Sequence, residues 1–225
     1  MSKIYKIYKM STKSYTNVFG TKNYIIGISG IIGVGKSTLT NNIGNKLNCN
    51  ILKEPVETNE YLSNFYKDMS RYSFPMQVYL LNHRFKQHQQ MVWSDNCTIQ
   101  DRTIYEDVIF AKILNESKMM EDLDFQTYIS LFQNMSNFLH RPDLIIYLDV
   151  EPEEALRRIN LRSRDCESNI SIEYLKKLKI GYEDWLNDIK DRIPVLHLDW
   201  NTFKDTDDII IQINEMLKNK KGLIF

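Results

Sequence analysis

Residues 24–38 read Tyr-Ile-Ile-Gly-Ile-Ser-Gly-Ile-Ile-Gly-Val-Gly-Lys-Ser-Thr. A short apolar strand is expected here to lead into Gly30-x-x-x-x-Gly35-Lys36-Ser37, which is the spacing of a phosphate-binding loop. In such a loop backbone N–H groups face the β-phosphate, the lysine reaches the β- and γ-phosphate oxygens, and the hydroxyl binds Mg²⁺. The residues that we expect to hold the phosphates are Gly30, Gly33, Val34, Gly35, Lys36, Ser37 and Thr38. The loop predicts a nucleotide-binding chain but does not specify the reaction.

Length and composition limit the class of protein. At 225 residues and 43% hydrophobic content, one α/β domain of ordinary size is expected. Lys and Arg number 29 and so do Asp and Glu, so no global basic field favours binding to nucleic acid or to an anionic membrane. No apolar run approaches the ~18 residues that span a bilayer. We therefore expect a soluble protein with neither nucleic acid nor membrane as a partner.

The cysteines Cys49, Cys97 and Cys166 form no CxxC motif and no Cys/His cluster. This pattern argues against a zinc site or a disulfide framework and favours a reducing compartment. Residues 1–23 contain five lysines and no arginine or acidic residue, so a transit peptide, which favours arginine, is the weaker interpretation. We predict a cytoplasmic protein in which residues 1–23 form a mobile extension before a single domain at 24–225.

Short apolar segments alternate with long helical ones along the rest of the chain. Strands are predicted at residues 23–29, 50–54, 98–101, 144–150 and 195–199. This alternation predicts an α/β fold, a parallel sheet of five strands with helices on both faces and a binding crevice at the carboxyl ends of the strands. Leu39, Ile43 and Leu47 predict a helix directly after the phosphate loop, which argues against a glycine-rich turn without a ligand. An apolar stripe at residues 125–139 predicts another helix, in the core or at a subunit interface.

Two charged clusters follow predicted strands and therefore lie at the same edge of the sheet as the phosphate loop. Glu54-Pro55-Val56 follows the second strand, and Asp101-Arg102-Thr103 follows the third. At this edge Asp101 is able to reach Mg²⁺, and Arg102 is able to reach a phosphate or a substrate hydroxyl. A surface carboxylate and a surface ion pair are the plain alternatives for these clusters.

Arginines are concentrated after the fourth predicted strand, in Arg157-Arg158-Ile159-Asn160-Leu161-Arg162-Ser163-Arg164. At about 100° per residue, Arg158 and Arg162 share one helical face, and Arg157 and Arg164 share another. This density of positive charge favours a helical lid over a polyphosphate, and a solvated charged face is the alternative. Asp165 and Glu167 follow where such a lid would meet the rest of the substrate.

Taken together, these motifs resemble the deoxynucleoside kinases, the family that contains deoxycytidine, deoxyguanosine and deoxyadenosine kinases. The resemblance covers residues 24–217. Besides the loop and the lid, its marks are Glu54-Pro55-Val56, Tyr66, Gln77 with Arg84, Asp101-Arg102-Thr103 through Asp107, Pro142-Asp143-Leu144-Ile145-Ile146-Tyr147-Leu148-Asp149 and Glu167. It implies a P-loop kinase fold, a homodimer, ATP and Mg²⁺ as cofactors, and transfer of the γ-phosphate to the 5′-hydroxyl of a deoxynucleoside in nucleotide salvage.

The resemblance also implies roles for individual residues. Glu54 would accept the proton of the 5′-hydroxyl, Arg102 would position that hydroxyl, and Lys36 and Arg162 would stabilise the transferred charge. Ser37 and Asp101 would hold Mg²⁺, while Arg158, Arg162 and Phe203 would contact ATP. The residues implied at the nucleoside are Tyr66 and Glu167 for the sugar and Gln77, Arg84, Asp107 and Phe110 for the base.

Departures from the animal enzymes resemble the bacterial-type deoxyadenosine and deoxyguanosine kinases. Asp101 stands where the animal enzymes usually have Glu, and no tryptophan follows Glu54-Pro55-Val56. Ser163 replaces the glycine usual in the lid, and the spacing from Asp107 to Phe110 is one residue shorter than in the animal enzymes. The resemblance favours a purine deoxynucleoside, with deoxycytidine as a further candidate and thymidine as a poor substrate.

Two other functions share part of this pattern. A nucleoside monophosphate kinase of the thymidylate-kinase type has the loop, an Asp-Arg element and an arginine lid, but it needs a site for the acceptor's phosphate. A nucleotide-binding switch or scaffold without turnover is the alternative from another class, and the chain contains no Asp-x-x-Gly switch motif. The residues expected at the sugar and the base fit an uncharged nucleoside, so we favour the deoxynucleoside kinase.

Overall fold

A computed structural model describes residues 23–55, 59–137, 139–162 and 170–220 of the chain. Its strands are β1 (Ile25–Ser29), β2 (Asn50–Leu52), β3 (Thr98–Asp101), β4 (Leu144–Asp149) and β5 (Val195–Asp199). Its helices are α1 (Lys36–Leu47), α2 (Leu62–Lys67), α3 (Met69–Val92), α4 (Asp107–Glu116), α5 (Asp122–Ser136), α6 (Pro152–Arg162), α7 (Ile172–Ile189) and α8 (Thr206–Lys220), with a 3₁₀ turn, η2 (Ile104–Glu106), before α4. All five predicted strands are present.

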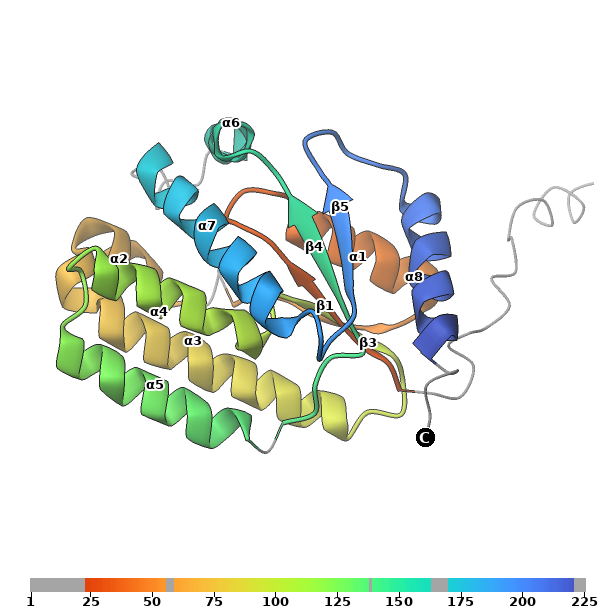
Figure 1. The fold of residues 1–225 in the computed structure, drawn as a ribbon, viewed down its shortest axis with the longest axis horizontal. Coiled ribbons are helices and arrows are strands. Elements are labelled where there is room, and N and C mark those ends of the chain that lie inside the picture. Colours follow the sequence, from red (N-terminus) through yellow and green to blue (C-terminus); the bar gives the residue numbers. More distant parts are fainter. Residues whose placement is uncertain (1–22, 56–58, 138, 163–169, 221–225) are drawn as a thin grey trace, which may run out of the picture.

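The strands form one parallel sheet in the order β2-β3-β1-β4-β5 (Figure 1). β1 lies at the centre, and all of its residues are buried. A strand covered on both faces needs a continuous apolar run, which Ile25, Ile26 and Ile28 supply. Within the sheet, β2 and β3 lie on one side of β1, and β4 and β5 lie on the other. The loop after β1 therefore lies at a topological switch point, where open α/β sheets bind their ligands.

Three strands are shorter than the sequence predicts. β1 begins at Ile25 and not at residue 23, and β4 ends at Asp149 and not at residue 150. β2 ends at Leu52, the last residue in register with β3, and not at residue 54. Because β2 is an edge strand with one neighbour, and Pro55 has no N–H to donate, nothing extends its ladder further. Glu54 therefore lies in the loop beyond the strand.

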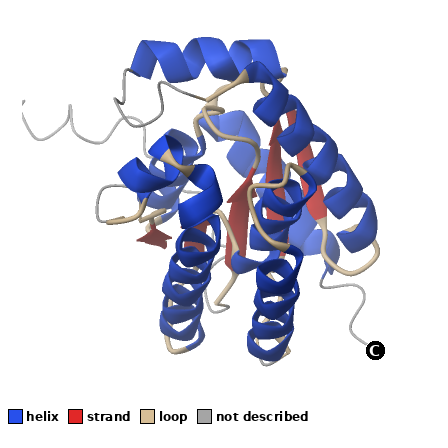
Figure 2. Cartoon of the chain, turned by 90° about the vertical axis from the view of Figure 1, so that its left-hand side faces the viewer, coloured by secondary structure: helices blue, strands red, loops and turns tan. Residues whose placement is uncertain are grey.

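Helices cover both faces of the sheet, as predicted. α1 and α8 pack together on one side, while α3, α4 and α7 lie on the other, with α5 against α3 and α4 (Figure 1). Figure 2 shows the strands enclosed between these helices. α6, the predicted lid, lies beyond the carboxyl ends of the strands, towards which the arrows in Figure 1 point. The elements that carry the predicted site therefore meet at one end of the sheet.

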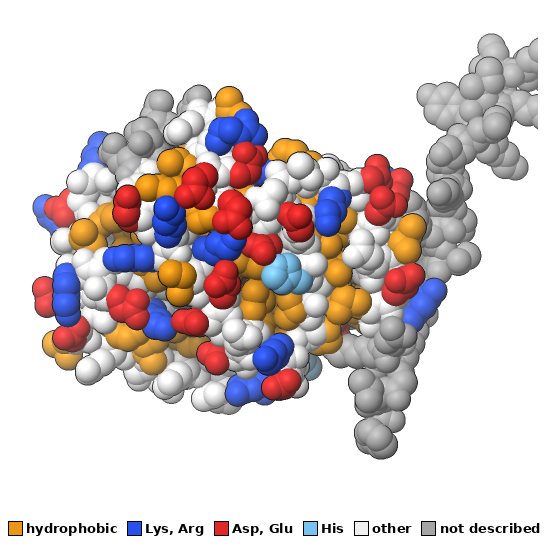
Figure 3. All heavy atoms as spheres, turned by 45° about the horizontal axis from the view of Figure 1, so that its top comes forward, with side chains coloured by type: hydrophobic (Ala, Val, Ile, Leu, Met, Phe, Trp, Pro, Cys, Tyr) orange, Lys and Arg blue, Asp and Glu red, His pale blue; other side chains and the backbone are white. Residues whose placement is uncertain are grey.

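The core has two parts. The larger cluster surrounds the sheet, and the smaller one joins α2, α3, α4 and α5 around Phe65, Leu81 and Tyr128. The stripe predicted at residues 125–139 is partly buried against this second cluster, and its helix is confirmed as α5. Leu123, on the same helix, is 74% exposed. The face of the molecule in Figure 3 carries acidic and basic side chains interspersed, in keeping with the balanced charge of the chain. Among the described residues, no helix has the length and apolarity that crossing a bilayer requires.

Candidate active site

The phosphate loop has the backbone conformation that its glycines permit. Gly33 and Gly35 have φ angles of 85° and 96°, and a Cβ on Gly33 would lie 2.7 Å from the carbonyl oxygen of Ala155. Lys36 begins α1, and its Nζ donates to the carbonyl oxygens of Gly30 and Ile31 at 3.1 and 2.8 Å. Burial lowers the pKa of Lys36 to about 8, and the positive charge of Arg102 acts in the same direction. The loop thus holds a buried cation at the start of a helix, where phosphate oxygens are favoured.

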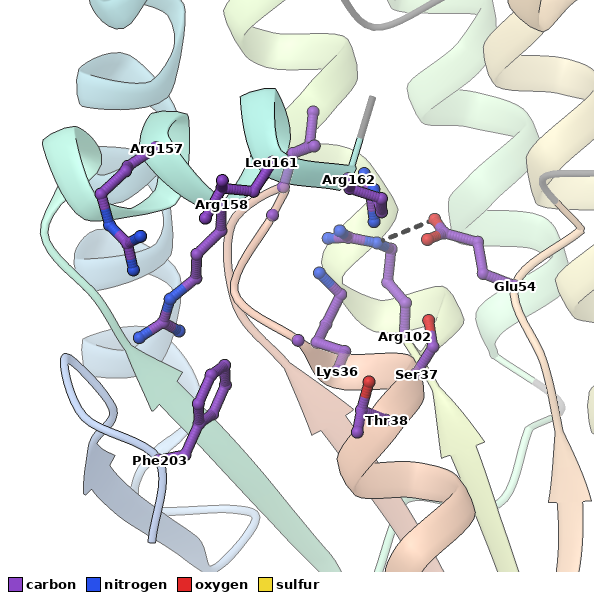
Figure 4. Close-up of a pocket in the computed structure, with 13 residues that line it drawn as sticks. Lys36, Ser37, Thr38, Glu54, Arg102, Arg157, Arg158, Leu161, Arg162 and Phe203 are labelled. Atoms are coloured by element: carbon purple, nitrogen blue, oxygen red, sulfur yellow. Dashed lines mark hydrogen bonds and ion pairs between the residues drawn. The ribbon is translucent and has the colours of Figure 1, made fainter. Parts of the chain in front are cut away.

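A cavity of about 400 Å³ lies over this loop (Figure 4). It is lined by five regions far apart in the sequence, namely the loop with the start of α1, the segments after β2, β3 and β5, and the end of α6. The residues predicted for ATP that line it are Gly33, Gly35, Lys36, Ser37, Thr38, Arg158, Arg162 and Phe203, together with Glu54 and Arg102. Two predicted loop residues do not line it: Val34 is buried, and Gly30 offers its carbonyl oxygen to Lys36. The cavity therefore presents the ring of Phe203 and the phosphate loop to one ligand, a combination that suits a nucleotide.

The arginines of α6 differ in their contacts. Arg158 donates to the carbonyl oxygens of Val34, Trp200 and Asn201 at 3.0, 2.8 and 2.8 Å, and its guanidinium lies 4.3 Å from the ring centre of Phe203. Arg157 is exposed and pairs with Glu154. Figure 4 shows Arg162 on the side of α6 nearest to Arg102 and Glu54. Arg158 therefore joins the lid to the phosphate loop and to the segment after β5, which its spacing alone does not reveal.

Ser37 and Asp101 lie together, as the predicted Mg²⁺ site requires. The Ser37 hydroxyl donates to Oδ2 of Asp101. Oδ1 of Asp101 is buried and has no hydrogen-bond partner among the described residues. Burial raises the pKa of Asp101, and the negative charge of Glu54 raises it further. A hydroxyl and a carboxylate beside a phosphate-binding loop fit Mg²⁺, which takes few protein oxygens and completes its shell with water and phosphate. Within the described part of the chain, no group of three His, Cys, Asp or Glu residues forms an all-protein metal site.

Glu54 accepts from two guanidinium groups through one oxygen atom. Nε of Arg102 and one terminal nitrogen of Arg84 lie 3.0 and 2.8 Å from its Oε1. Burial alone would raise the pKa of Glu54, but Arg102, Arg84 and Lys36 outweigh it and lower the pKa to about 2. The Glu54 side chain is 22% exposed, and it lines the large cavity beside Lys36. The carboxylate is therefore ionised and faces the phosphate loop.

A second cavity, of about 70 Å³, adjoins the first and is also lined by Glu54. Tyr66, Gln77 and Phe110 line it, as predicted for the nucleoside. Arg84 and Asp107 do not line it; they are buried and paired with each other at 2.6 Å. The remaining predicted nucleoside residue, Glu167, lies outside the described residues. A pocket for a small molecule commonly measures roughly 300–1,000 Å³, so a nucleoside requires this cavity to widen.

Glu106 is a site residue that the sequence analysis missed. It is fully buried, and its carboxylate accepts from the Ser29 hydroxyl at 2.8 Å, the Thr103 N–H at 2.7 Å and the Arg102 guanidinium at 3.2 Å. Tyr182 donates to the same carboxylate and accepts from Arg102. Arg102 has a φ of 71°, an uncommon conformation for a residue with a side chain. This network therefore holds Arg102 against backbone strain.

Two glutamines also support Glu54 from behind. Gln100 of β3 donates to the side-chain oxygen of Gln87 at 3.0 Å, and Gln87 donates to the carbonyl oxygen of Lys53 at 2.7 Å. Both glutamines are buried. They fix the backbone immediately before Glu54, where the chain is no longer part of β2.

A local sequence signal existed for Glu106, because Thr103-x-x-Glu106 has the spacing of a helix capping box, which the structure contains. No local signal marks Gln87, Gln100 or Tyr182.

Comparisons with known proteins agree with this geometry. The family model for deoxynucleoside kinase matches residues 26–218. A deoxyadenosine kinase of Dictyostelium discoideum is 51% identical over 193 residues, covering 86% of this chain and 77% of the relative. A deoxyadenosine/deoxycytidine kinase of Bacillus subtilis (strain 168) is 38% identical over 194 residues, covering 84% of this chain and 89% of the relative.

A solved structure has the same fold. The deoxyadenosine kinase from M. mycoides with bound dATP superposes with a TM-score of 0.78 at 34% sequence identity, covering 85% of this chain and all of that one. The phosphate loop, the cavity above it and Glu54 at its inner end lie within the matched residues. With a family match over most of its length and relatives well above 30% identity, this chain belongs to the deoxynucleoside kinase family.

Proposed function

We propose that this deoxynucleoside kinase transfers the γ-phosphate of ATP to the 5′-hydroxyl of deoxyadenosine in preference to the other deoxynucleosides. The observation that carries the proposal is that Glu54 lines both cavities. A carboxylate at the junction of a phosphate site and a largely apolar pocket that also presents Gln77 and Tyr66 stands where a nucleoside hydroxyl would meet the phosphate. The relative from Dictyostelium discoideum, 51% identical, is a deoxyadenosine kinase, which supports the choice of base.

The chemistry follows from the charges around this junction. Phosphoryl transfer passes through a loose transition state whose charge lies on the equatorial oxygens, so catalysis depends on positioning and electrostatic stabilisation. Lys36 and Arg162 supply positive charge beside the transferred group, and Arg102 orients the 5′-hydroxyl. Glu54 accepts the proton as the new bond forms, which requires hydrogen-bond reach more than high basicity. Mg²⁺, held by Ser37 and Asp101, would neutralise charge on the phosphates.

The groups that we propose to recognise the base form a defined set of donors and acceptors, of which Gln77 lines the small cavity while Arg84 and Asp107 are buried beside it. Gln77 donates and accepts, Arg84 only donates, and ionised Asp107 only accepts. These groups match the amino group and ring nitrogens of adenine, whereas the thymine methyl would press against a charged pair and remove its solvent without compensation. Phe110, whose ring lies 4.7 Å below the Arg102 guanidinium, lines the same pocket. Tyr66 and Glu167 complete the proposed site at the sugar.

We also propose that the enzyme is a homodimer located in the cytoplasm. A homodimer is supported by the family resemblance, and a role in nucleotide salvage is consistent with the activity. A cytoplasmic location is supported by the free thiols of Cys49 and Cys97, which suit a reducing compartment. We also propose that residues 24–225 form the kinase domain and residues 1–23 an extension; the latter lie almost wholly outside the described residues.

A panel of acceptors tests the proposal. The four deoxynucleosides and their 5′-monophosphates are each supplied with ATP and Mg²⁺, and release of ADP is measured. We expect the highest kcat/KM with deoxyadenosine, lower values with deoxyguanosine and deoxycytidine, and the lowest with thymidine. Turnover of monophosphates alone, or of thymidine before the others, would overturn the proposal.

A further inference from the structure

Arg84 connects two carboxylates that the proposed mechanism uses for different purposes. One terminal nitrogen lies 2.8 Å from Oε1 of Glu54, and the other lies 2.6 Å from Oδ1 of Asp107. The side chains of Arg84 and Asp107 are 1% and 2% exposed. A single buried cation therefore links the proposed base-recognition group to the proposed proton acceptor.

The chemistry of the guanidinium makes this link rigid. Its nitrogens form a planar fork, so the group that binds Asp107 and the group that binds Glu54 cannot move independently. Burial adds a second constraint, because solvent does not reach Arg84 or Asp107 to replace a lost partner. A displacement of Asp107 therefore changes the position of Arg84 and, with it, the contact at Glu54.

Around the pair of Arg84 and Asp107, several buried polar atoms lack hydrogen-bond partners among the described residues. Oδ2 of Asp107, Nε of Arg84 and Oε1 of Gln77 are buried without a hydrogen-bond partner among the described residues. Gln77 and Arg84 are seven residues apart on α3, so one face of the helix presents both. Unpaired buried polar atoms cost free energy, and a ligand that pairs with them recovers it. The edge of a nucleobase has the donors and acceptors to do so.

We propose that Arg84 is a positioning residue that couples recognition of the nucleobase to the placement of Glu54. A base that satisfies Asp107 and Arg84 holds the guanidinium in one orientation and so keeps Oε1 of Glu54 in place against the 5′-hydroxyl. A base that leaves Asp107 unpaired loosens the same contact. Selectivity for the base is then expressed in the rate of phosphoryl transfer and not only in affinity. The inference rests on the proposed function, because it takes Glu54 as the proton acceptor.

Wild-type enzyme and two acceptors provide the first test. 2′-Deoxynebularine is deoxyadenosine without the 6-amino group, so it cannot donate to Asp107. Single-turnover rates are measured at saturating ATP and saturating nucleoside, and dissociation constants are measured separately. We expect the rate with 2′-deoxynebularine to fall roughly tenfold or more, the loss that a hydrogen bond to a charged group commonly produces. An unchanged rate with weaker binding alone would overturn the inference.

Variants of two arginines on α3 provide the second test. Arg84→Met should lower the rate with deoxyadenosine and remove most of the difference between the two acceptors. Arg71→Met is the matched control, because Arg71 lies on the same helix, is exposed, and has its guanidinium over the ring of Tyr72, while its contact with the N-cap Asp68 is made by the backbone N–H and is kept in the variant. It should retain both the wild-type rate and the difference. An Arg84→Met enzyme that still separates the two acceptors as strongly as wild type would contradict the proposed coupling.

The two proposals fail in different ways. If wild type phosphorylates no deoxynucleoside, the proposed function is wrong and this inference falls with it. If deoxyadenosine is phosphorylated but the rate is indifferent to the 6-amino group, only the coupling through Arg84 is wrong. The comparison of acceptors uses unmodified protein, so it decides the matter even if Arg84→Met does not fold.

Discussion

Glu106 illustrates how a residue outside both cavities supports the chemistry within them. Its carboxylate accepts from Ser29, Thr103, Arg102 and Tyr182 in a fully buried place. Hydrogen bonds to charged groups contribute about 1.5–3 kcal/mol, so we expect Glu106→Gln to lower the free energy of unfolding by about that amount. The substitution should also lower kcat, because it removes the negative charge of Glu106 that holds Arg102 in its strained backbone conformation.

Urea denaturation and steady-state kinetics measure the two effects. Glu116→Gln is the control, since Glu116 is exposed at the end of α4 and pairs loosely with Lys112 at 3.9 Å. It should change stability by no more than about 0.5 kcal/mol. A Glu106→Gln protein with wild-type stability and kcat would show that the network around Arg102 is dispensable.

Asp107 makes stability depend on pH in a predictable direction. Burial raises its pKa from 3.8 to about 7, although Arg84 opposes the shift. Since the folded state binds this proton more tightly than the unfolded state, the contribution is fully present below about pH 4. It is lost as pH rises through 7, at a slope on the order of 1.4 kcal/mol per pH unit. Glu54 has a lowered pKa, so its contribution to stability is fully present above its unfolded pKa and is lost as pH falls below that value.

The measurement is the difference in unfolding free energy between wild type and Asp107→Asn from pH 4 to pH 8. Taking the difference removes other groups, such as His88, whose pKa burial lowers to about 4. We expect wild type to lose stability relative to the variant as pH rises from 4 to 7, with no further change above. A difference that does not vary with pH would mean that Asp107 titrates alike in the folded and unfolded states.

Among the elements, α6 depends on Arg158 for its attachment. Arg158 donates to three backbone carbonyl groups from two other segments, whereas Arg157, one residue away, is exposed and contacts Glu154 within the helix. We expect Arg158→Ala to raise the KM for ATP about tenfold or more, since several charge-assisted hydrogen bonds order the donor cavity. Arg157→Ala should raise it far less. Equal effects of the two substitutions would indicate that charge near the phosphates matters and attachment of the lid does not.

The contrast between α6 and η2 shows what local sequence is able to predict. The arginine spacing predicted the helix α6, because a periodic pattern belongs to one element and requires no knowledge of its neighbours. The partners of Arg158 are carbonyl groups of distant loops, which only the assembled sheet brings together. The capping-box spacing of Thr103-x-x-Glu106 predicts only that Glu106 begins a helical turn; it does not indicate that the Glu106 carboxylate also accepts from Arg102. Tyr182 reaches Arg102 from α7, and nothing near it in the sequence indicates that contact.

For the whole molecule, the sequence predicted the layout better than the exact ends of the strands. The phosphate loop and the alternation of apolar segments predicted the parallel sheet, which the structure contains. The family match agrees with that fold. Strand ends depend on which neighbour continues the ladder, which is why β2 stops at Leu52. Arg84 and Asp107 were predicted to face the base, yet they are buried beside the small cavity and paired with each other. Their burial depends on packing between α3 and α4, which no motif encodes.

The extent of the catalytic domain is a prediction at this scale. The family match begins at residue 26, and the first strand begins at Ile25. We therefore expect deletion of residues 2–21 to leave kcat/KM and the melting temperature within experimental error. Thermal denaturation and the deoxyadenosine assay of the shortened protein measure both. A large fall in melting temperature would show that the first residues contribute to the folded domain.

Glu54, at the junction of the two cavities, is the group that we propose to accept the proton of the 5′-hydroxyl. The most direct test of this role is the single-turnover rate of Glu54→Gln with ATP, Mg²⁺ and saturating deoxyadenosine, with deoxyadenosine affinity measured in parallel. Because the amide keeps the shape but cannot take the proton, we expect the rate to fall about 10² to 10⁴-fold while affinity changes little. A Glu54→Gln enzyme that transfers phosphate at close to the wild-type rate would show that Glu54 is not the proton acceptor.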